Sequence, residues 1–153
     1  MSTAAAIQEM LAGQDYIADR QTAMSIHLAQ TLKRPLLIEG PAGVGKTEVA
    51  KVMARALDTE LIRLQCYEGL DAHTSLYEWN YQRQILHLKL DEKSQRPLAE
   101  READIFADSF LLKRPLLQAI TRPKPPVLLI DELDRADEEF ESFLLEVLSE
   151  WQI

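Results

Sequence analysis

One stretch of the chain, from Gly40 to Thr47, matches the pattern G-x-x-x-x-G-K-[ST] in full. The apolar run Leu36-Leu37-Ile38 precedes it, and apolar residues at helical spacing from Val49 to Leu57 follow it. A strand, a glycine-rich turn and an amphipathic helix in this order are typical of loops that cradle phosphate groups. The alternative interpretation is a glycine-rich turn carrying a surface lysine, which the complete pattern and its flanking elements disfavour.

Each residue type in this loop has a chemical role. Glycines let the backbone curl so that successive N–H groups point at phosphate oxygens, and the following helix adds its positive end. We expect Lys46 to reach the β- and γ-phosphates and to be catalytic, and the Thr47 hydroxyl to bind Mg²⁺. The predicted nucleotide-binding residues are Gly40, Pro41, Ala42, Gly43, Val44, Gly45, Lys46, Thr47 and Glu48.

A second motif places two carboxylates, Asp131 and Glu132, directly after the apolar run from Val127 to Ile130. The run predicts a buried strand that carries Asp131 to the carboxyl edge of a parallel sheet, where ligands bind. We expect Asp131 to hold Mg²⁺ and Glu132 to activate water as a general base. The alternative is an acidic turn that caps the last helix, although Asp137 or Asp134 could serve as that cap without help from Asp131.

The rest of the chain predicts helices that alternate with short strands, which indicates an α/β fold with a parallel sheet. Residues 91–101 read as a loop, and Lys113-Arg114-Pro115 would kink or break the helical patch around it. The expected helices cover residues 4–11, 20–32, 46–57, 71–88, 104–120 and 140–148, and the expected strands cover residues 36–38, 61–64 and 127–130.

Composition excludes several classes of protein. The net charge of −8 disfavours a uniformly basic nucleic-acid binder. Cys66 is the only cysteine, so no intrachain disulfide and no cysteine-based zinc site is expected. No apolar run approaches the roughly 20 residues of a membrane span, and the N-terminus does not resemble a secretion signal. We therefore expect a cytoplasmic protein without a membrane span.

The phosphate loop and the LLIDE segment together resemble the AAA+ ATPases. The segments GPAGVGKTEVAK, LIRLQCYEGLD, LYEWNYQRQIL and PPVLLIDELDRADEEFESFLLEVLSEWQI resemble the MoxR family, and within it the CoxD-like branch, which is associated with maturation of carbon monoxide dehydrogenase and related molybdenum enzymes. The resemblance covers nearly all of the chain. It implies a three-layer P-loop NTPase core of the AAA+ type, ATPase activity, and ATP and Mg²⁺ as cofactors.

The same resemblance implies partners. Members of the family form homo-oligomeric rings that remodel a protein client or help to load its cofactor, here a molybdenum-containing dehydrogenase. The resemblance also places the adenine near Tyr16 and Ile17, although a simple packing role for both is an equal alternative.

The chain ends at Ile153, soon after the second motif. The resemblance implies that a complete module continues with a sensor strand, an arginine finger and a helical lid. We expect either a piece of a longer protein, which we favour, or a chain that borrows the missing strand. Residues 1–153 then form one partial nucleotide-binding domain, and hydrolysis by this chain alone is doubtful. Its expected parts are residues 1–34 (helical), 35–66 (strand, loop, helix and strand), 67–122 (helical insert) and 123–153 (second motif and helix).

Three other functions remain open. A nucleotide-binding module without hydrolysis would bind ATP and act through partner contacts. A small-molecule P-loop kinase would consume ATP only with an acceptor, and the Asp131–Glu132 pair favours hydrolysis over it. A DNA-directed motor is disfavoured by the negative charge.

Two smaller signals concern packing. Tyr77, Trp79 and Tyr81 alternate, so they could line one face of a strand or lie at a helix end, either in the core or facing a partner. Cys66 is expected to be a small buried hydrophobic residue rather than a nucleophile.

Overall fold

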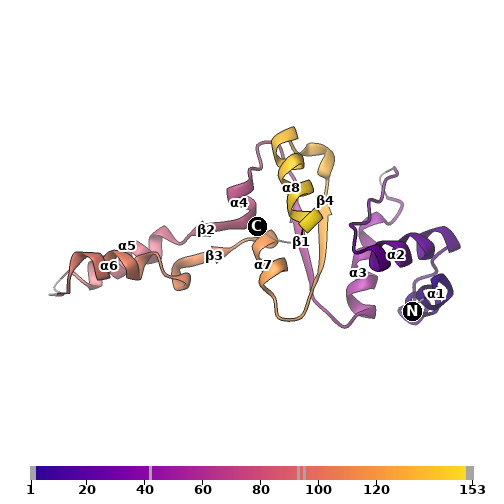
Figure 1. Ribbon diagram of the computed structural model, residues 1–153, viewed down its shortest axis with the longest axis horizontal. Helices are drawn as coiled ribbons and strands as arrows, with labels where there is room; N and C mark the ends of the chain where they lie inside the picture. The colour runs from indigo at the N-terminus through magenta and orange to yellow at the C-terminus, as the bar shows by residue number, and fades with distance from the viewer. Residues whose placement is uncertain (1–2, 42, 93, 95, 151–153) are drawn as a thin grey trace.

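The computed structural model describes residues 3–41, 43–92, 94 and 96–150. The molecule consists of a body, in which helices lie on both sides of a small sheet, and of an arm that projects from it (Figure 1). Within the described residues, no helix combines the length and the apolar character needed to cross a membrane.

The sheet of the body has two parallel strands, β1 (Leu61–Gln65) and β4 (Val127–Asp131). Leu61 lies opposite Val127, and Gln65 lies opposite Asp131. Because side chains alternate along a strand, Ile62 and Leu64 of β1 are buried whereas Arg63 and Gln65 are exposed. The parallel α/β arrangement predicted from the sequence is confirmed for this pair.

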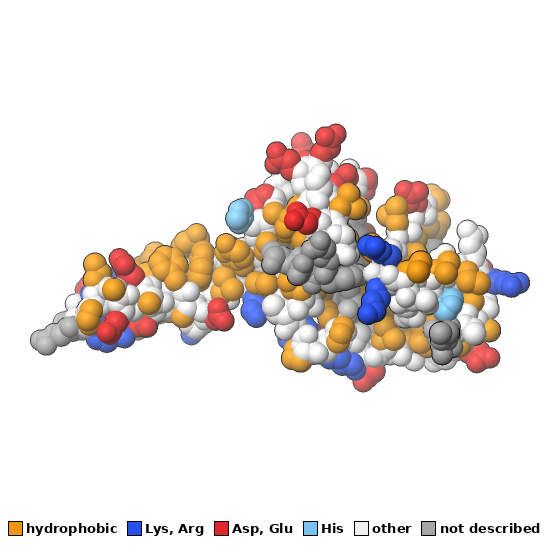
Figure 2. Space-filling model, viewed as in Figure 1, with side chains coloured by type: hydrophobic (Ala, Val, Ile, Leu, Met, Phe, Trp, Pro, Cys, Tyr) orange, Lys and Arg blue, Asp and Glu red, His pale blue; other side chains and the backbone are white. Residues whose placement is uncertain are grey.

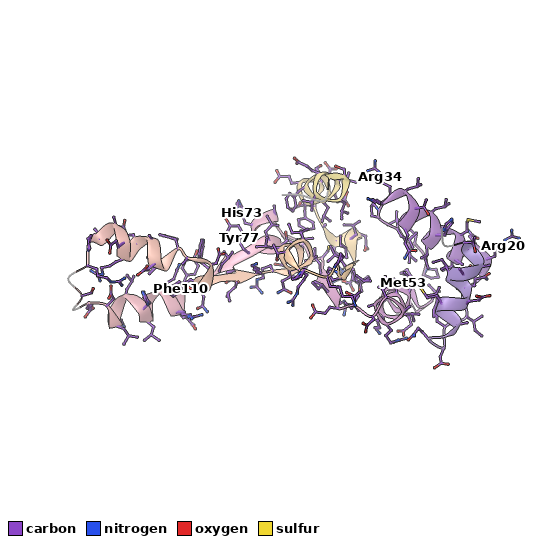
Figure 3. All side chains as sticks on the ribbon, turned by 60° about the horizontal axis from the view of Figure 1, so that its bottom comes forward. Arg20, Arg34, Met53, His73, Tyr77 and Phe110 are labelled. Carbon is purple, nitrogen blue, oxygen red and sulfur yellow. The ribbon has the colours of Figure 1, made fainter. Side chains whose placement is uncertain are left out.

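Helix α3 (Lys46–Ala56) packs against one face of the sheet, and α1 (Ala4–Ala12) and α2 (Arg20–Leu32) cover α3. Thr3 and Asp19 begin α1 and α2 by accepting hydrogen bonds from backbone N–H groups of the first turn, which fixes where these helices start. Figure 3 labels Met53 of α3 in this layer. The buried residues of this cluster are Ile7, Leu11, Ala18, Ala23, Ile26, Val49, Val52 and Met53.

Helices α4 (Ala72–Leu76), α7 (Pro115–Thr121) and α8 (Glu138–Glu150) enclose a second cluster on the other side of β1 and β4. Asp137 caps α8, since its carboxylate accepts a 2.9 Å hydrogen bond from the Phe140 N–H. Leu128 and Ile130 of β4 pack against this cluster. Its buried residues are Leu64, Cys66, Leu70, Leu76, Leu116, Phe140 and Leu144.

The arm is a hairpin of β2 (Tyr77–Trp79) and β3 (Leu111–Lys113), which are antiparallel, extended by α5 (Tyr81–Leu90), α6 (Leu98–Ile105) and the 3₁₀ turn η1 (Asp108–Phe110). In Figure 3, Phe110 lies near the base of the helical part, and His73 and Tyr77 lie where the arm meets the body. Arg96 joins the two helices because it forms ion pairs with Asp91 at 3.1 Å and Asp104 at 2.7 Å.

The strand expected at residues 36–38 is absent. Residues 34–40 form neither a helix nor a strand, and the Leu37 side chain is 70% exposed. An isolated extended segment gains no ladder hydrogen bonds, and within the described residues β4 pairs only with β1. The same open edge leaves β4 half-buried, so the expectation of a fully buried strand there was also wrong.

The helices expected at residues 71–88 and 104–120 were also wrong in extent. Tyr77–Trp79 and Leu111–Lys113 leave the helical pattern because they pair with each other, and α6 begins inside the expected loop of residues 91–101. Pro115 does not kink a helix; it occupies the first turn of α7, where its missing N–H costs no hydrogen bond. The arm falls within the predicted 67–122 insert.

Candidate nucleotide-binding site

The loop before α3 has the backbone that its glycines permit. Gly43 and Gly45 have φ angles of 82° and 87°, values at which any other residue would be strained, although there is open space around both. Among the residues that the structure describes, no side chain caps the first turn of α3 after Gly45, in contrast to α1 and α2. This helix start therefore offers backbone N–H groups to an anion. Ala42 lies outside the described residues.

Lys46 folds back over this loop. Its ammonium donates hydrogen bonds to the carbonyl oxygens of Gly40 at 2.5 Å and Pro41 at 2.8 Å. The positive charge is thus held at the loop, close to the helix start. To bind a phosphate, Lys46 would exchange these carbonyl oxygens for phosphate oxygens.

Asp131 ends β4 on the sheet face that α3 covers. Val127 packs against the α3 cluster, whereas Leu128 and Ile130 pack against the opposite one. Alternation along the strand then puts Asp131 on the side of Val127. The loop before α3 and the end of β4 both lie toward the top of Figure 1. The fold thus brings the two sequence motifs to one end and one face of the sheet.

Both oxygens of the Asp131 carboxylate have partners. Oδ2 accepts a 2.6 Å hydrogen bond from the Arg63 guanidinium, and Oδ1 accepts one of 3.1 Å from the N–H of Glu132. Arg63 also donates to Oε1 of Gln65 at 2.7 Å. Arg63 and Gln65 belong to β1, so the neighbouring strand provides a positive group beside the predicted metal ligand.

Sequence reasoning missed Arg63 and Gln65. The signal was the alternation in Leu61-Ile62-Arg63-Leu64-Gln65, whose two polar positions share one strand face. Once β1 is placed parallel to β4 with Gln65 opposite Asp131, that face must be the one that carries Asp131.

Glu132 follows with an unusual backbone conformation, with φ 55° and ψ 44°. Its carboxylate forms a 3.0 Å ion pair with Arg135 of the 3₁₀ turn η2 (Leu133–Arg135). Few non-glycine residues adopt such angles, and they cluster at functional sites. The Glu132 side chain is 42% exposed to solvent.

The other predicted site residues lie as follows. Thr47 is in the first turn of α3 and half-buried, and Val44 is exposed. Glu48 extends its carboxylate along α3 to Lys51, at 3.1 Å, and toward Arg55, so its side chain points along the helix. Its role in nucleotide binding stays a prediction.

The two residues predicted to lie near the adenine differ in their surroundings. Tyr16 packs against the α3 cluster, whereas the Ile17 side chain is 96% exposed. Tyr16 therefore has a packing role, and Ile17 offers a free apolar surface. Their contact with a base stays a prediction.

Cys66 lies just beyond β1, and its N–H donates to the carbonyl oxygen of Asp131 at 2.9 Å. The residue is 1% exposed. Burial raises the pKa of the Cys66 thiol, and the charge of Asp131 raises this pKa further. A thiol that is held protonated is a poor nucleophile, so the structure agrees with the packing role expected for Cys66.

The residues predicted to hold Mg²⁺ have suitable chemistry. A threonine hydroxyl and a carboxylate provide the oxygen ligands that this ion prefers, and it retains several water molecules in such sites. In this structure, however, one oxygen of Asp131 is bound to Arg63.

A hollow lies at the opposite end of the sheet, near the start of β1, and does not include the predicted site. Charged side chains line it, and among them Arg122 pairs with Glu60 at 3.1 Å and Lys124 with Asp58 at 3.2 Å. We assign no function to it.

Comparison with known proteins gives short partial matches. A tRNA dimethylallyltransferase of Finegoldia magna is 39% identical over 62 residues, which cover 39% of this chain and 20% of that protein. A tRNA dimethylallyltransferase of Chlamydia abortus is 32% identical over 82 residues, which cover 52% of this chain and 23% of that protein. A ClpA homolog protein of Fuscovulum blasticum is 39% identical over 74 residues, which cover 44% of this chain and 9% of that protein. The chain thus spans about a quarter or less of these relatives, and no solved structure matches it.

The family comparison covers much more of the chain. The AAA ATPase domain matches residues 21–151, which include the glycine-rich loop, both strands of the sheet, the arm and the acidic pair. The match agrees with the P-loop core expected from the two motifs. The chain therefore belongs to the AAA ATPase domain family.

Proposed function

We propose that this chain binds Mg-ATP at the glycine-rich loop and that the complete protein hydrolyses it. The observation that carries the proposal is the position of Asp131, which ends β4 on the sheet face covered by α3. The first turn of α3 carries Lys46 and Thr47. Family membership supports ATP as the nucleotide.

The roles of the residues follow from their chemistry. The backbone N–H groups at the start of α3 and the Lys46 ammonium bind phosphate oxygens. Thr47 and Asp131 would hold Mg²⁺, which neutralises charge on the phosphates when bound. Glu132 accepts a proton from the attacking water through its carboxylate, of which Oε2 pairs with Arg135.

We further propose that the energy of hydrolysis drives remodelling or cofactor maturation of a partner enzyme. The resemblance to the CoxD-like branch of the MoxR family suggests a molybdenum-containing dehydrogenase as the client and a homo-oligomeric ring as the working form in the cytoplasm. Exposed apolar side chains on the arm, visible in orange in Figure 2, support contact with a protein. They include Tyr81, Ile85, Leu86, Leu90, Leu98 and Phe106.

The experiment that tests nucleotide binding is calorimetric titration of the chain with Mg-ATP. Lys46→Ala should abolish saturable binding because it removes the ammonium at the loop. Lys51→Ala is the matched control: it makes the same change one turn further along α3, where the lysine pairs with Glu48. Absence of binding in the wild type, or equal losses in both variants, would contradict the proposal.

The alternatives predict different turnover. A module without hydrolysis would bind ATP but release no phosphate, with or without a partner. A small-molecule kinase would consume ATP only when an acceptor is added. Measuring phosphate release with and without candidate acceptors separates both from an ATPase, and salt-dependent DNA binding would favour a DNA-directed motor.

A further inference from the structure

The strongest observation that the proposed function leaves unused is the contact between Arg63 and Asp131. Arg63 comes from the middle of β1, and its guanidinium nitrogen lies 2.6 Å from Oδ2 of the carboxylate that ends β4. The strand register fixes this contact, because Arg63 lies opposite Leu129 and Gln65 lies opposite Asp131 on one sheet face. A guanidinium matches the geometry of a carboxylate closely.

The pair is poorly suited to a structural role. The Arg63 side chain is 53% exposed and that of Asp131 is 22% exposed, so solvent screens their attraction. Exposed ion pairs contribute little to stability. On β1, stability comes from the buried neighbours Ile62 and Leu64. What the pair does is occupy one of the two carboxylate oxygens of Asp131.

We propose that Arg63 competes with Mg²⁺ for Asp131, so that it sets the Mg²⁺ concentration at which the nucleotide is bound tightly. This inference rests on the proposed Mg-ATP site. Oδ1 of Asp131 is engaged by the N–H of Glu132, and Oδ2 is engaged by Arg63. A second cation at Oδ2 would be repelled by the guanidinium over a few ångströms. Arg63 must therefore move away before the ion can bind directly to Oδ2 of Asp131.

A hydrogen-bond acceptor for the displaced guanidinium is already present on β1. The same terminal nitrogen that contacts Asp131 also donates to Oε1 of Gln65 at 2.7 Å. Arg63 can release the carboxylate and keep the Gln65 amide as its acceptor. The exchange then requires only a change of side-chain position, without any change in β1 or β4.

The test is the Mg²⁺ dependence of nucleotide binding. A fluorescent ATP analogue is bound to the full chain, first in EDTA and then at increasing Mg²⁺, and the Mg²⁺ midpoint is measured. Arg63→Gln should lower this midpoint by about two- to fivefold, the range that corresponds to an exposed ion pair. Arg63→Lys keeps the positive charge but lacks the planar guanidinium, so its Mg²⁺ midpoint should lie between those of the wild type and Arg63→Gln. Thermal melting of each variant checks that it is folded.

Two control variants separate competition at Asp131 from a general charge effect. Arg122→Gln removes the same charge from a pair with Glu60, at the opposite end of β1, and should leave the midpoint unchanged. Arg135→Gln removes a charge next to Glu132 instead of Asp131 and should shift the midpoint less than Arg63→Gln does.

The outcomes distinguish this inference from the proposed function. If the wild type binds the analogue through Lys46 and Arg63→Gln leaves the midpoint unchanged, the competition is refuted and the nucleotide site stands. An equal shift in Arg122→Gln would also refute it, because the effect would then be one of net charge. If the wild type binds no nucleotide at any Mg²⁺ concentration, both proposals fail.

Discussion

At the scale of single residues, Glu132 combines an unusual backbone with an exposed ion pair. Its φ of 55° places it in the left-handed region, where a non-glycine side chain is held at a cost of about 1–3 kcal/mol. The residue between a strand and a 3₁₀ turn thus has a defined orientation. A general base needs such an orientation more than it needs burial.

Glu132→Gln should therefore separate binding from hydrolysis. The amide keeps the size of the side chain but cannot accept a proton from water, so Mg-ATP affinity should stay within about twofold while turnover of the complete protein falls by roughly 10²–10⁴-fold. Calorimetry and phosphate release measure the two effects. Glu139→Gln, on the exposed side of α8, is the control. Unchanged turnover in Glu132→Gln would assign water activation to another group.

The residues of this site were predictable to different degrees. The loop residues and the acidic pair are predicted from local patterns, and their role in nucleotide binding stays a prediction. Arg63 was not found because its partner lies 68 residues away, and only the register of two distant strands brings them together. The alternation along β1 places Arg63 and Gln65 on one strand face, but no local pattern in the sequence identifies Asp131 as the residue they lie beside.

At the scale of elements, the start of α2 depends on a titrating side chain. The carboxylate of Asp19 accepts a 2.6 Å hydrogen bond from the N–H of Thr22, and this bond holds the pKa of Asp19 below its ordinary value of 3.8. Because the folded-state pKa is lowered, the stabilisation is present above the unfolded value and is lost as pH falls through the folded one.

Asp19→Asn should remove this pH dependence, because asparagine caps a helix without titrating. The melting temperature of the wild type should fall more steeply than that of the variant once the pH drops below about 4. Thermal melts across this range measure the difference. Parallel curves for the two proteins would show that the cap does not contribute.

The second cluster depends on α8. Phe140 is 1% exposed and packs among the side chains around Leu64 and Leu116, so Phe140→Ala should destabilise the chain by about 3–5 kcal/mol. Leu145 lies on the same helix but is 70% exposed, and Leu145→Ala should cost about 0.5 kcal/mol or less. Denaturant unfolding measures both. Equal effects would mean that α8 is not packed as described.

The helices and strands whose own residues show a helical or strand pattern were predicted correctly. Helices α1, α2, α3 and α8 have apolar periodicity or caps in their own sequence, β4 is mainly a short apolar run, and β1 alternates apolar and polar residues from Ile62 onward. Residues 36–38 are equally apolar but form no strand, because a strand also needs a neighbour. For Tyr77–Trp79 the expected helix was wrong, since pairing with Leu111–Lys113 overrode a helical pattern, whereas the strand left open by the alternation of Tyr77 and Trp79 is what forms.

At the scale of the whole molecule, the arm and the nucleotide site are separate (Figure 1). Trp79 and Leu111 are paired, and the N–H of Asn80 donates to the carbonyl of Phe110 at 2.9 Å. The ends of the segment between them are therefore adjacent. This adjacency lets the outer arm be removed without separating β2 from β3.

Replacing residues 80–110 by an Asn-Gly turn should leave Mg-ATP affinity within about twofold of the wild type, since that dipeptide favours a tight hairpin turn. Calorimetry measures the affinity, and adding Lys46→Ala to the shortened chain should abolish it. Loss of binding on shortening alone would show that the arm supports the site. If the arm contacts the client, the shortened protein should bind nucleotide but lose that contact.

The pairing of β1 with β4 has a consequence for the order of folding. Leu61 cannot meet Val127 until all the intervening chain has closed into a loop, whereas the β2–β3 hairpin forms within that loop. Each halving of a loop lowers its closure cost by only about 0.6 kcal/mol, equivalent to roughly threefold in rate. The shortening removes somewhat less than half of this loop, so the shortened chain should refold about twofold faster in a stopped-flow experiment. The arm, far from the phosphate loop, would then help to set how quickly a newly made chain acquires its nucleotide site.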